Sequence, residues 1–485
     1  MKQAHIFDQR RAGVLMHITS LPTGNLGADA YRFVDFLQQA GVTIWQMLPL
    51  GPTHEDGSPY QCLSAHAGNN KLLCVDYIQA QAWIKTEELA GKKIFTIVAN
   101  AYKQFVENST ETDKLAFNNF CQQQAFWLED YILYRELRNL NHALPWYDWP
   151  PEFRDREPAT LKSLSEQRSE SLNIRRFEQF LFFQQWHNLK NYANQHHVKL
   201  FGDMPIFVAH DSADVWAAPE LFTLDENGQA TKVTGVPPDY FSATGQRWGN
   251  PLYDWQAHLD ENFDWWVKRL STQLELFDLI RIDHFRGFEA CWEIPASCET
   301  AIEGDWGKAP GEALFKKLLS VFDELPLVAE DLGIITEEVT ALREQFAMPG
   351  MKILQFAFGG DADNPYLPHQ HCKDSITYTG THDNNTSLGW YREIEESTRQ
   401  HLHEYIGPSD EAMPWLLIRV ALKSVSQLAV IPLQDLFELE GEHRMNVPGT
   451  LDGNWKWQFE WSMVPKDCTD RLRHLNQTYG RIIHE

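Results

Sequence analysis

The stretch Leu279-Ile-Arg-Ile-Asp283-His-Phe-Arg-Gly287 joins an apolar segment of strand length to charged residues at its end. Seven other short apolar runs, each bounded by turn residues, occur along the chain. Several are almost continuously apolar, as expected for parallel strands that are covered on both faces. The eight strands that we predict are residues 13–18, 43–48, 198–203, 279–283, 327–330, 351–356, 375–379 and 428–432.

Segments with helical periodicity separate many of these strands. Residues 31–40 carry Phe33, Phe36 and Leu37, and residues 314–322 repeat apolar side chains every four positions. Residues 415–427 and 470–483 show similar patterns. About eight alternations of strand and helix predict an α/β protein with a (β/α)8 TIM barrel as a single catalytic domain over residues 1–485. An open, doubly wound sheet would give the same local signals.

Two connections are longer than a plain crossover requires. We predict that residues 52–170, after the second strand, form a large insertion that is a mostly helical subdomain. We predict that residues 207–257, after the third strand and rich in Pro, Gly and aromatic residues, form an inserted loop region over the cleft. Long loops at this end of a barrel are where substrate sites are built. Residues 359–374, with Pro365 and Pro368, leave little room for a full helix.

The composition limits the classes of partner. The 42 basic and 67 acidic residues give a net charge of −25, which disfavours nucleic acid and anionic membranes as partners. No apolar run reaches the ~18 residues that a membrane-spanning helix needs. The seven cysteines form no CxxC pair, and the first residues contain no apolar signal region, so we expect a cytoplasmic protein with reduced thiols. These patterns set no oligomeric state.

Three acidic residues lie where predicted strands run into polar loops: Asp283, Glu330 in Ala-Glu-Asp-Leu-Gly, and Asp383 in Thr-His-Asp-Asn. The carboxyl ends of barrel strands form the catalytic mouth of this fold. Each residue alone also fits a structural ion pair or a helix N-cap. Three acids at the same end of three separate strands favour catalysis.

Asp283 and Glu330 lie on neighbouring predicted strands, which are ~4.8 Å apart in a sheet. This spacing is close to the ~5–5.5 Å between the two carboxyl groups of a retaining glycosidase. Arg281 shares the strand face of Asp283, where its guanidinium favours the ionised carboxylate. Glu330 has no basic neighbour in the sequence, so it can keep a proton to donate.

These segments resemble the signature segments of the 4-α-glucanotransferases, the amylomaltases or disproportionating enzymes of the α-amylase clan. Four other segments agree in order: Ser58-Pro-Tyr60, Gly202-Asp203-Met-Pro-Ile, Trp248-Gly-Asn250-Pro and Arg444-Met-Asn446-Val-Pro-Gly-Thr450. The resemblance runs from about residue 13 to about residue 457. The Arg-Met-Asn-x-Pro-Gly segment and the lack of a C-terminal β-domain point to amylomaltase rather than to a general amylase.

The resemblance assigns a role to each matching residue. It implies that Asp283 is the nucleophile, Glu330 the general acid and base, and Asp383 the stabiliser of the transition state. It implies neither a cofactor nor a metal ion. The substrate-binding residues that it implies are Arg281, which holds Asp283; His382, Asp203 and Asn446, which bind sugar hydroxyls; Tyr60, which stacks on a sugar; Trp248 and Asn250 near the acceptor; and Ser58 beside Tyr60.

The activity that these roles predict is transfer of α-1,4-glucan segments between maltooligosaccharides by a retaining double displacement. A retaining α-1,4-glucan hydrolase would differ only in the second acceptor, which would be water. A catalytically inactive glucan-binding protein is a third reading. The intact set of three carboxylates argues against it, because an unused buried charge costs stability.

Overall fold

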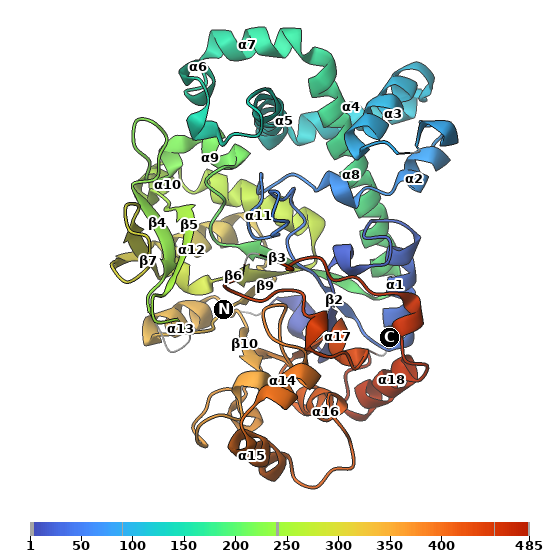
Figure 1. Ribbon diagram of the computed structural model, residues 1–485, viewed down its shortest axis with the longest axis vertical. Helices are drawn as coiled ribbons and strands as arrows, with labels where there is room; N and C mark the ends of the chain where they lie inside the picture. Colours follow the sequence, from blue (N-terminus) through green and yellow to red (C-terminus); the bar gives the residue numbers. More distant parts are fainter. Residues whose placement is uncertain (1–3, 90, 239–241, 451, 484–485) are drawn as a thin grey trace.

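The computed structural model describes residues 4–89, 91–238, 242–450 and 452–483. Eight parallel strands form one sheet in the order β10-β11-β12-β1-β2-β3-β6-β9 (Figure 1). The two outer strands meet where the Ala329 N–H donates to the carbonyl of Pro349 at 2.9 Å, so the sheet is a nearly closed barrel. Its strands are β1 Arg11–Leu15, β2 Ile44–Gln46, β3 Lys199–Pro205, β6 Leu279–Asp283, β9 Leu327–Ala329, β10 Gly350–Ile353, β11 Ser375–Tyr378 and β12 Leu428–Pro432.

The TIM-barrel prediction is confirmed, and each of the eight predicted strands overlaps one of these. Alternate side chains point to the two sides of the wall. On β6, Leu279 joins the apolar cluster that fills the barrel, whereas Ile280 and Ile282 belong to the cluster under the outer helices. Arg281 and Asp283 follow Leu279 at intervals of two, so they share the inner side. The strand period alone therefore carries both charged side chains to the mouth of the barrel.

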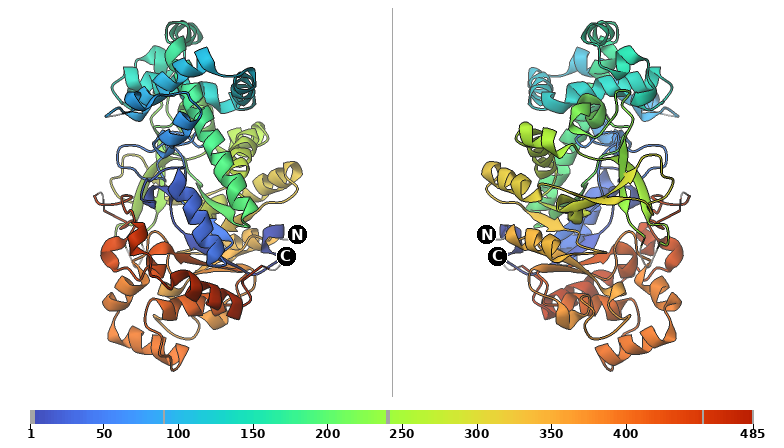
Figure 2. Two further views of the ribbon diagram at one scale, coloured as in Figure 1. Left: turned by 90° about the vertical axis from the view of Figure 1, so that its right-hand side faces the viewer. Right: turned by 90° about the vertical axis from the view of Figure 1, so that its left-hand side faces the viewer.

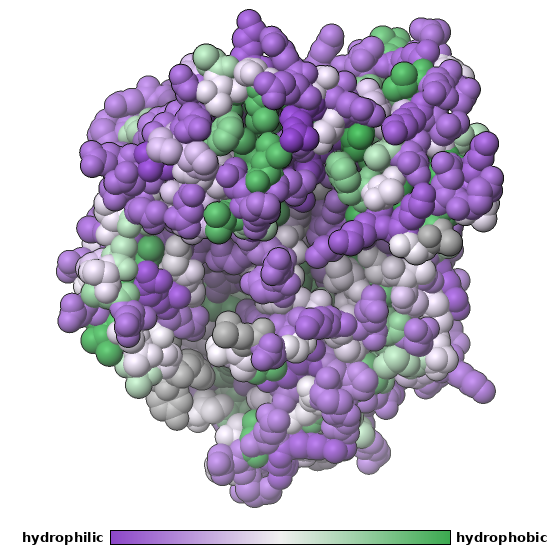
Figure 3. All heavy atoms as spheres, turned by 45° about the horizontal axis from the view of Figure 1, so that its top comes forward, coloured by the Kyte–Doolittle hydropathy of each residue, from purple (hydrophilic) through white to green (hydrophobic). Residues whose placement is uncertain are grey.

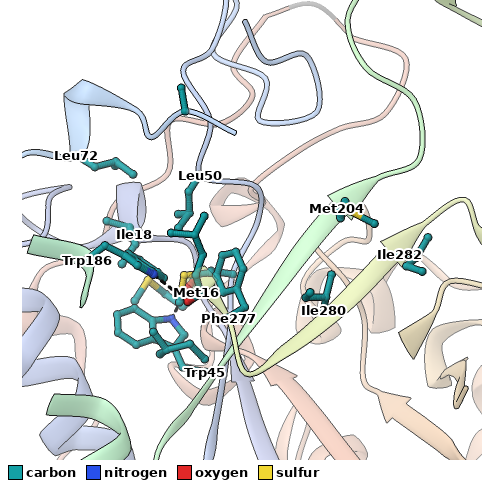
Figure 4. Packing of buried hydrophobic residues seen from close by; sticks show 14 of the residues in the cluster. Met16, Ile18, Trp45, Leu50, Leu72, Trp186, Met204, Phe277, Ile280 and Ile282 are labelled. Carbon is teal, nitrogen blue, oxygen red and sulfur yellow. Dashed lines mark hydrogen bonds between the residues drawn. The ribbon is translucent and has the colours of Figure 1, made fainter. Parts of the chain in front are cut away.

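Helices cover the outside of the barrel and bury the second apolar cluster. Figure 4 shows part of it, where the Trp45 indole N–H donates to the carbonyl of Met16 at 2.7 Å. The Trp186 N–H likewise donates to the carbonyl of Leu276 at 2.9 Å, so both large rings are buried with their polar atoms satisfied. The helices around the barrel are α1 Ala28–Gln39, α8 Ser169–Gln195, α11 Asp264–Leu276, α12 Gly311–Val321, α13 Glu337–Gln345, α16 Trp415–Lys423 and α18 Cys468–Thr478.

The chain between β2 and β3 is mostly helical and lies above the barrel in Figure 1. The 27-residue helix α8 belongs to both parts, because it runs from this region down to the barrel (Figure 2). Aromatic rings pack between the helices, and the ring centroids of Phe105 and Phe177 are 4.7 Å apart. The remaining helices here are α2 Val75–Ala80, α3 Ile94–Asn108, α4 Glu111–Gln123, α5 Ala125–Leu140, α6 Pro151–Arg154 and α7 Pro158–Gln167.

A second sheet of four antiparallel strands, in the order β5-β4-β7-β8, was not expected from the sequence. Its strands are β4 Lys232–Val236, β5 Gln246–Pro251, β7 Ala290–Pro295 and β8 Asp305–Lys308. They are short and contain Gly and charged residues, so they lack the apolar runs that marked the barrel strands. Residues 239–241 of the predicted loop region lie outside the described residues.

The other helices lie in the loops at the barrel ends. Between β10 and β11 the described chain has only 3-10 turns, in keeping with the little room expected there. No helix within the described ranges is long and apolar enough to cross a membrane. The helices in the loops at the barrel ends are α9 Ala213–Ala217, α10 Trp255–Asp260, α14 Ser387–Glu393, α15 Glu396–Ile406 and α17 Leu433–Leu436.

Candidate active site

Two of the three predicted acids are neighbours at the carboxyl ends of adjacent strands. Asp283 is the last residue of β6, and Glu330 directly follows β9. Ile282 pairs with Ala329 in the parallel register, so the next residue on each strand is one of the two acids. The backbone N–H of His284 donates to Oε2 of Glu330 at 2.7 Å. The loop that follows Asp283 is therefore tied to the side chain of Glu330.

Arg281 joins two carboxylates inside the barrel mouth. Its Nη2 donates to Oδ1 of Asp283 at 2.8 Å, and its Nη1 donates to the two oxygens of Asp203 at 2.8 and 2.6 Å. Both Arg281 and Asp203 are buried. One guanidinium thus orients the Asp283 carboxylate and offsets the charge of the deeper Asp203. The attraction between Arg281 and Asp203 is strong because both side chains are shielded from water.

Glu330 has the electrostatics of a proton donor. Burial raises its pKa to about 7; Arg281 opposes this shift, and the negative charge of Asp283 adds to it. The backbone of His284 has a left-handed φ of 54°, an uncommon conformation for a residue with a side chain. This turn aims its N–H at Glu330. The site therefore holds a carboxyl group that exchanges its proton near neutral pH.

Asp383, after β11, is held in the opposite electrostatic state. Asn446 donates to its Oδ1 at 2.6 Å, and Nε2 of His382 lies 3.3 Å from its Oδ2. Burial alone would raise the pKa of Asp383, but His382 and then Asn446 hold it below its ordinary value. Conversely, Asp383 overcomes the effect of burial and raises the pKa of His382. Each of the two side chains therefore favours the charged form of the other.

Tyr60 links this pair to the Arg281 group. Its hydroxyl donates to Oδ2 of Asp203 at 2.7 Å and lies 2.9 Å from Nε2 of His382. The Tyr60 ring stacks on the His382 ring, with centroids 5.2 Å apart and planes 18° apart. Trp455 completes an aromatic group, 5.9 Å from Tyr60. Sequence reasoning missed Trp455, and the only available signal was its place in the aromatic segment that follows Asn446.

The structure brings the remaining predicted residues less directly into this group. Trp248 on β5 packs edge-on against the His284 ring at 4.7 Å and is half-buried. Asn250 is buried and donates to the carbonyl of Val208, so its bonds tie the β5 segment to the chain after β3. Ser58 accepts the N–H of Tyr60 at 3.3 Å. Ser58 and Asn250 thus hold loops and, within the described residues, have no hydrogen bond to Asp283, Glu330 or Asp383.

Two hollows border the group of side chains around Tyr60 and His382. The first, which is partly open to solvent, contains about 450 Å³ of empty space and is lined by residues that include His17, Ser20, His382 and Arg444. The second, also partly open to solvent, contains about 550 Å³ of empty space and includes Tyr60 and Asp203 in its wall. Figure 3 shows a largely hydrophilic surface with a hollow near the middle of the face that it presents. Within the described parts of the chain, no group of three or more His, Cys, Asp or Glu side chains is placed to hold a metal ion.

A family model described as 4-alpha-glucanotransferase matches residues 16–463. The chain belongs to the 4-alpha-glucanotransferase family. It is 46% identical to the 4-alpha-glucanotransferase of Thermus thermophilus, over 98% of this chain and 99% of the relative, and 43% identical to that of Synechocystis sp., over 99% of both. The predicted family and enzyme class are confirmed.

Solved structures agree with this 4-alpha-glucanotransferase assignment. The amylomaltase from Streptococcus agalactiae in complex with acarbose is 34% identical and superimposes with a TM-score of 0.94, over 98% of this chain and 100% of that chain. The amylomaltase from Corynebacterium glutamicum, at 18% identity and a TM-score of 0.77, shares the fold; the match covers 98% of this chain and 76% of that chain. The family match, the curated relatives and the 34% identical amylomaltase favour glucan transfer over the hydrolase alternative.

Proposed function

We propose that the chain transfers α-1,4-glucan segments between maltooligosaccharides by a retaining double displacement. The observation that carries this proposal is the pair formed by Asp283 and Glu330. Asp283 accepts a hydrogen bond from Arg281, whereas the pKa of Glu330 is raised to about 7, mainly by burial. Two adjacent carboxyl groups in unlike environments suit a nucleophile and a general acid.

In the first step, a carboxylate oxygen of Asp283 attacks the anomeric carbon of the donor glucan. The bond to the leaving O4 breaks as Glu330 gives that oxygen its proton. The products are a covalent glucosyl-enzyme ester and a free oligosaccharide with a new 4-hydroxyl group. Arg281 keeps Asp283 oriented for attack, with its second nitrogen anchored on Asp203.

In the second step, the Glu330 carboxylate takes the proton from the 4-hydroxyl of an acceptor glucan. The acceptor oxygen attacks the anomeric carbon, and the ester bond to Asp283 breaks. Asp383 stabilises the positive charge that develops on the sugar ring in both transition states. One α-1,4 bond is broken and one is formed, and two inversions retain the anomeric configuration.

The residues around the carboxylates supply the sugar contacts in this proposal. His382, Asp203 and Asn446 bind hydroxyl groups of the donor, and Tyr60 presents its ring to a sugar. Trp248 and Asn250, on the strand that flanks His284, lie on the acceptor side, and Ser58 positions the Tyr60 loop. A relative that was crystallised with acarbose, a pseudo-oligosaccharide, supports a ligand of this class.

The two insertions and the cysteines support the remaining proposals. We assign residues 52–170 as a helical subdomain and residues 207–257 as a cover over the cleft, which would exclude water and favour a sugar acceptor. All seven cysteines are free in the structure, which supports a reducing, cytoplasmic compartment.

Incubation with pure maltotriose tests the proposed reaction. Transfer yields glucose and longer oligosaccharides while the number of reducing ends stays nearly constant, because each cleavage is matched by a new bond. Hydrolysis would raise the reducing ends in step with glucose release. That second outcome would replace the transferase with the retaining hydrolase.

A further inference from the structure

The first of the two hollows contains buried polar atoms that have no role in the mechanism above. His17 and Ser20, just after β1, both line it. Nδ1 of His17 and Oγ of Ser20 are buried and have no hydrogen-bond partner within the described chain. Both residues are more than nine-tenths buried. Such atoms are costly unless water or a ligand satisfies them, and this hollow has both the room and the polar lining for water.

His382 forms part of the same wall. The Tyr60 hydroxyl spends its one proton on Asp203, at 2.7 Å, so it can only accept from Nε2 of His382, at 2.9 Å. Nε2 therefore carries a proton, which also faces Oδ2 of Asp383. The other ring nitrogen, Nδ1, has no hydrogen bond to any described residue. Whether Nδ1 also carries a proton decides whether His382 is a neutral imidazole or a cation.

His17 is suited to accept a hydrogen bond from Nδ1 of His382 when that nitrogen carries a proton. Burial, followed by the positive charge of His382, lowers the pKa of His17 to about 3, so His17 is neutral at working pH. A neutral imidazole has one nitrogen that accepts. The charged and titratable groups that face His382 are Tyr60 after β2, Asp203 on β3, Arg281 on β6, Asp383 on its own loop, Arg444 after β12 and His17 after β1.

We propose that His17 is a positioning residue for His382: through ordered water in the shared hollow, it accepts the hydrogen bond of Nδ1–H and keeps His382 doubly protonated. The cationic ring then stays paired with Asp383 and under Tyr60, with its donors fixed toward the sugar. This inference deepens the proposed function, since it rests on His382 as a donor to the bound glucan. It also predicts a property of the free enzyme.

A direct test follows the protonation of His382 by NMR in protein with ¹³C-labelled histidine, whose His382 signal is assigned by its loss in His382→Gln. His17→Phe removes the acceptor and should lower the titration midpoint of His382 by about one pH unit. His17→Asn places an amide oxygen near the position of Nδ1 and should restore most of the midpoint. An unchanged midpoint in folded His17→Phe overturns the proposal.

Two further variants keep the test decisive. His258→Phe, which replaces another buried imidazole on α10 beside the ring of Tyr253, should leave the His382 midpoint in place. A shift as large as that of His17→Phe in this control would show a general packing effect and overturn the proposal. If His17→Phe does not fold, His17→Met, an apolar side chain of similar volume, takes its place with the same expected shift.

Kinetics with maltosyl fluoride connect this effect to catalysis. Fluoride leaves without a proton from Glu330, so the fall of kcat/KM at high pH then follows His382. His17→Phe should move that fall to lower pH by the same amount as the NMR midpoint. A loss that is uniform across pH would indicate packing alone and contradict the proposal. Failure of the wild-type enzyme to use maltosyl fluoride would count against the proposed function, while the NMR titration would still decide the role of His17.

Discussion

Arg281 donates a hydrogen bond of 2.8 Å to Oδ1 of Asp283 from a position two residues earlier on the same inner side of β6. The other terminal nitrogen of the guanidinium, Nη1, donates to both carboxylate oxygens of Asp203. The proposed nucleophile is thus oriented by a cation that is itself anchored on Asp203, a buried acid of the neighbouring strand β3.

Replacing Arg281 with Met should lower both stability and activity. Asp203 would keep a buried negative charge without its partner, which typically costs about 3–5 kcal/mol. Urea unfolding measures this loss, and Arg281→Lys, which keeps the charge but not the fork of donors, should lose less. An unfolding midpoint equal to that of the wild type would show that Asp203 is neutral in the native protein.

Variants of the two acids that we propose as catalytic should each be blocked at a different step of the reaction. Asp283→Asn lacks the nucleophile and should form no covalent intermediate from any donor. Glu330→Gln should lose nearly all activity on maltooligosaccharides but still form the intermediate with a maltosyl fluoride, because fluoride needs no proton to leave. Mass spectrometry of the digested protein locates the residue to which the sugar is covalently attached. Its attachment to a residue other than Asp283 would refute the assignment.

Glu330→Gln should also change how stability depends on pH. The pKa of Glu330 is about 7 in the folded chain, against an ordinary value of 4.5. Between these values the native state keeps a proton that the unfolded chain has released, so wild-type stability falls as pH rises. Glutamine has no such proton. The variant should therefore gain about 1–3 kcal/mol over the wild type between pH 4 and pH 8. If the free energies of unfolding of the variant and the wild type differed by the same amount at every pH, Glu330 would not be buried as described.

The thiols should all be free in the purified protein. All seven cysteines are unpaired in the structure, and burial raises the pKa of Cys62, Cys291 and Cys468 to about 12, so these three should react slowly when folded. Titration of denatured, unreduced protein should count seven thiols. A count of five would reveal a disulfide and argue against a reducing compartment.

Much of the barrel could be predicted from the sequence, because its determinants are local. A run such as Leu279–Asp283 carries its own period of two, which assigns Leu279, Arg281 and Asp283 to one face before any partner strand is known. The shared polarity of parallel strands then predicts that Asp283, Glu330 and Asp383 gather at one end. The four-stranded antiparallel sheet escaped prediction, because strands such as β8 Asp305–Lys308 have neither an apolar run nor a buried face.

The contacts between the gathered side chains depend on tertiary structure. Tyr60 and Asp203 are 143 positions apart, and Tyr60 and His382 are 322 apart, so no local pattern predicts that one hydroxyl serves both. Nor does a local pattern predict that His17 and His382 line one hollow, or that Trp455 lies beside Tyr60. The sequence by itself determined which side chains point into the barrel mouth, since strand period is a property of neighbouring residues. Only the tertiary structure decided which of them share hydrogen bonds, because hydrogen bonds and burial arise from chain segments that meet in space.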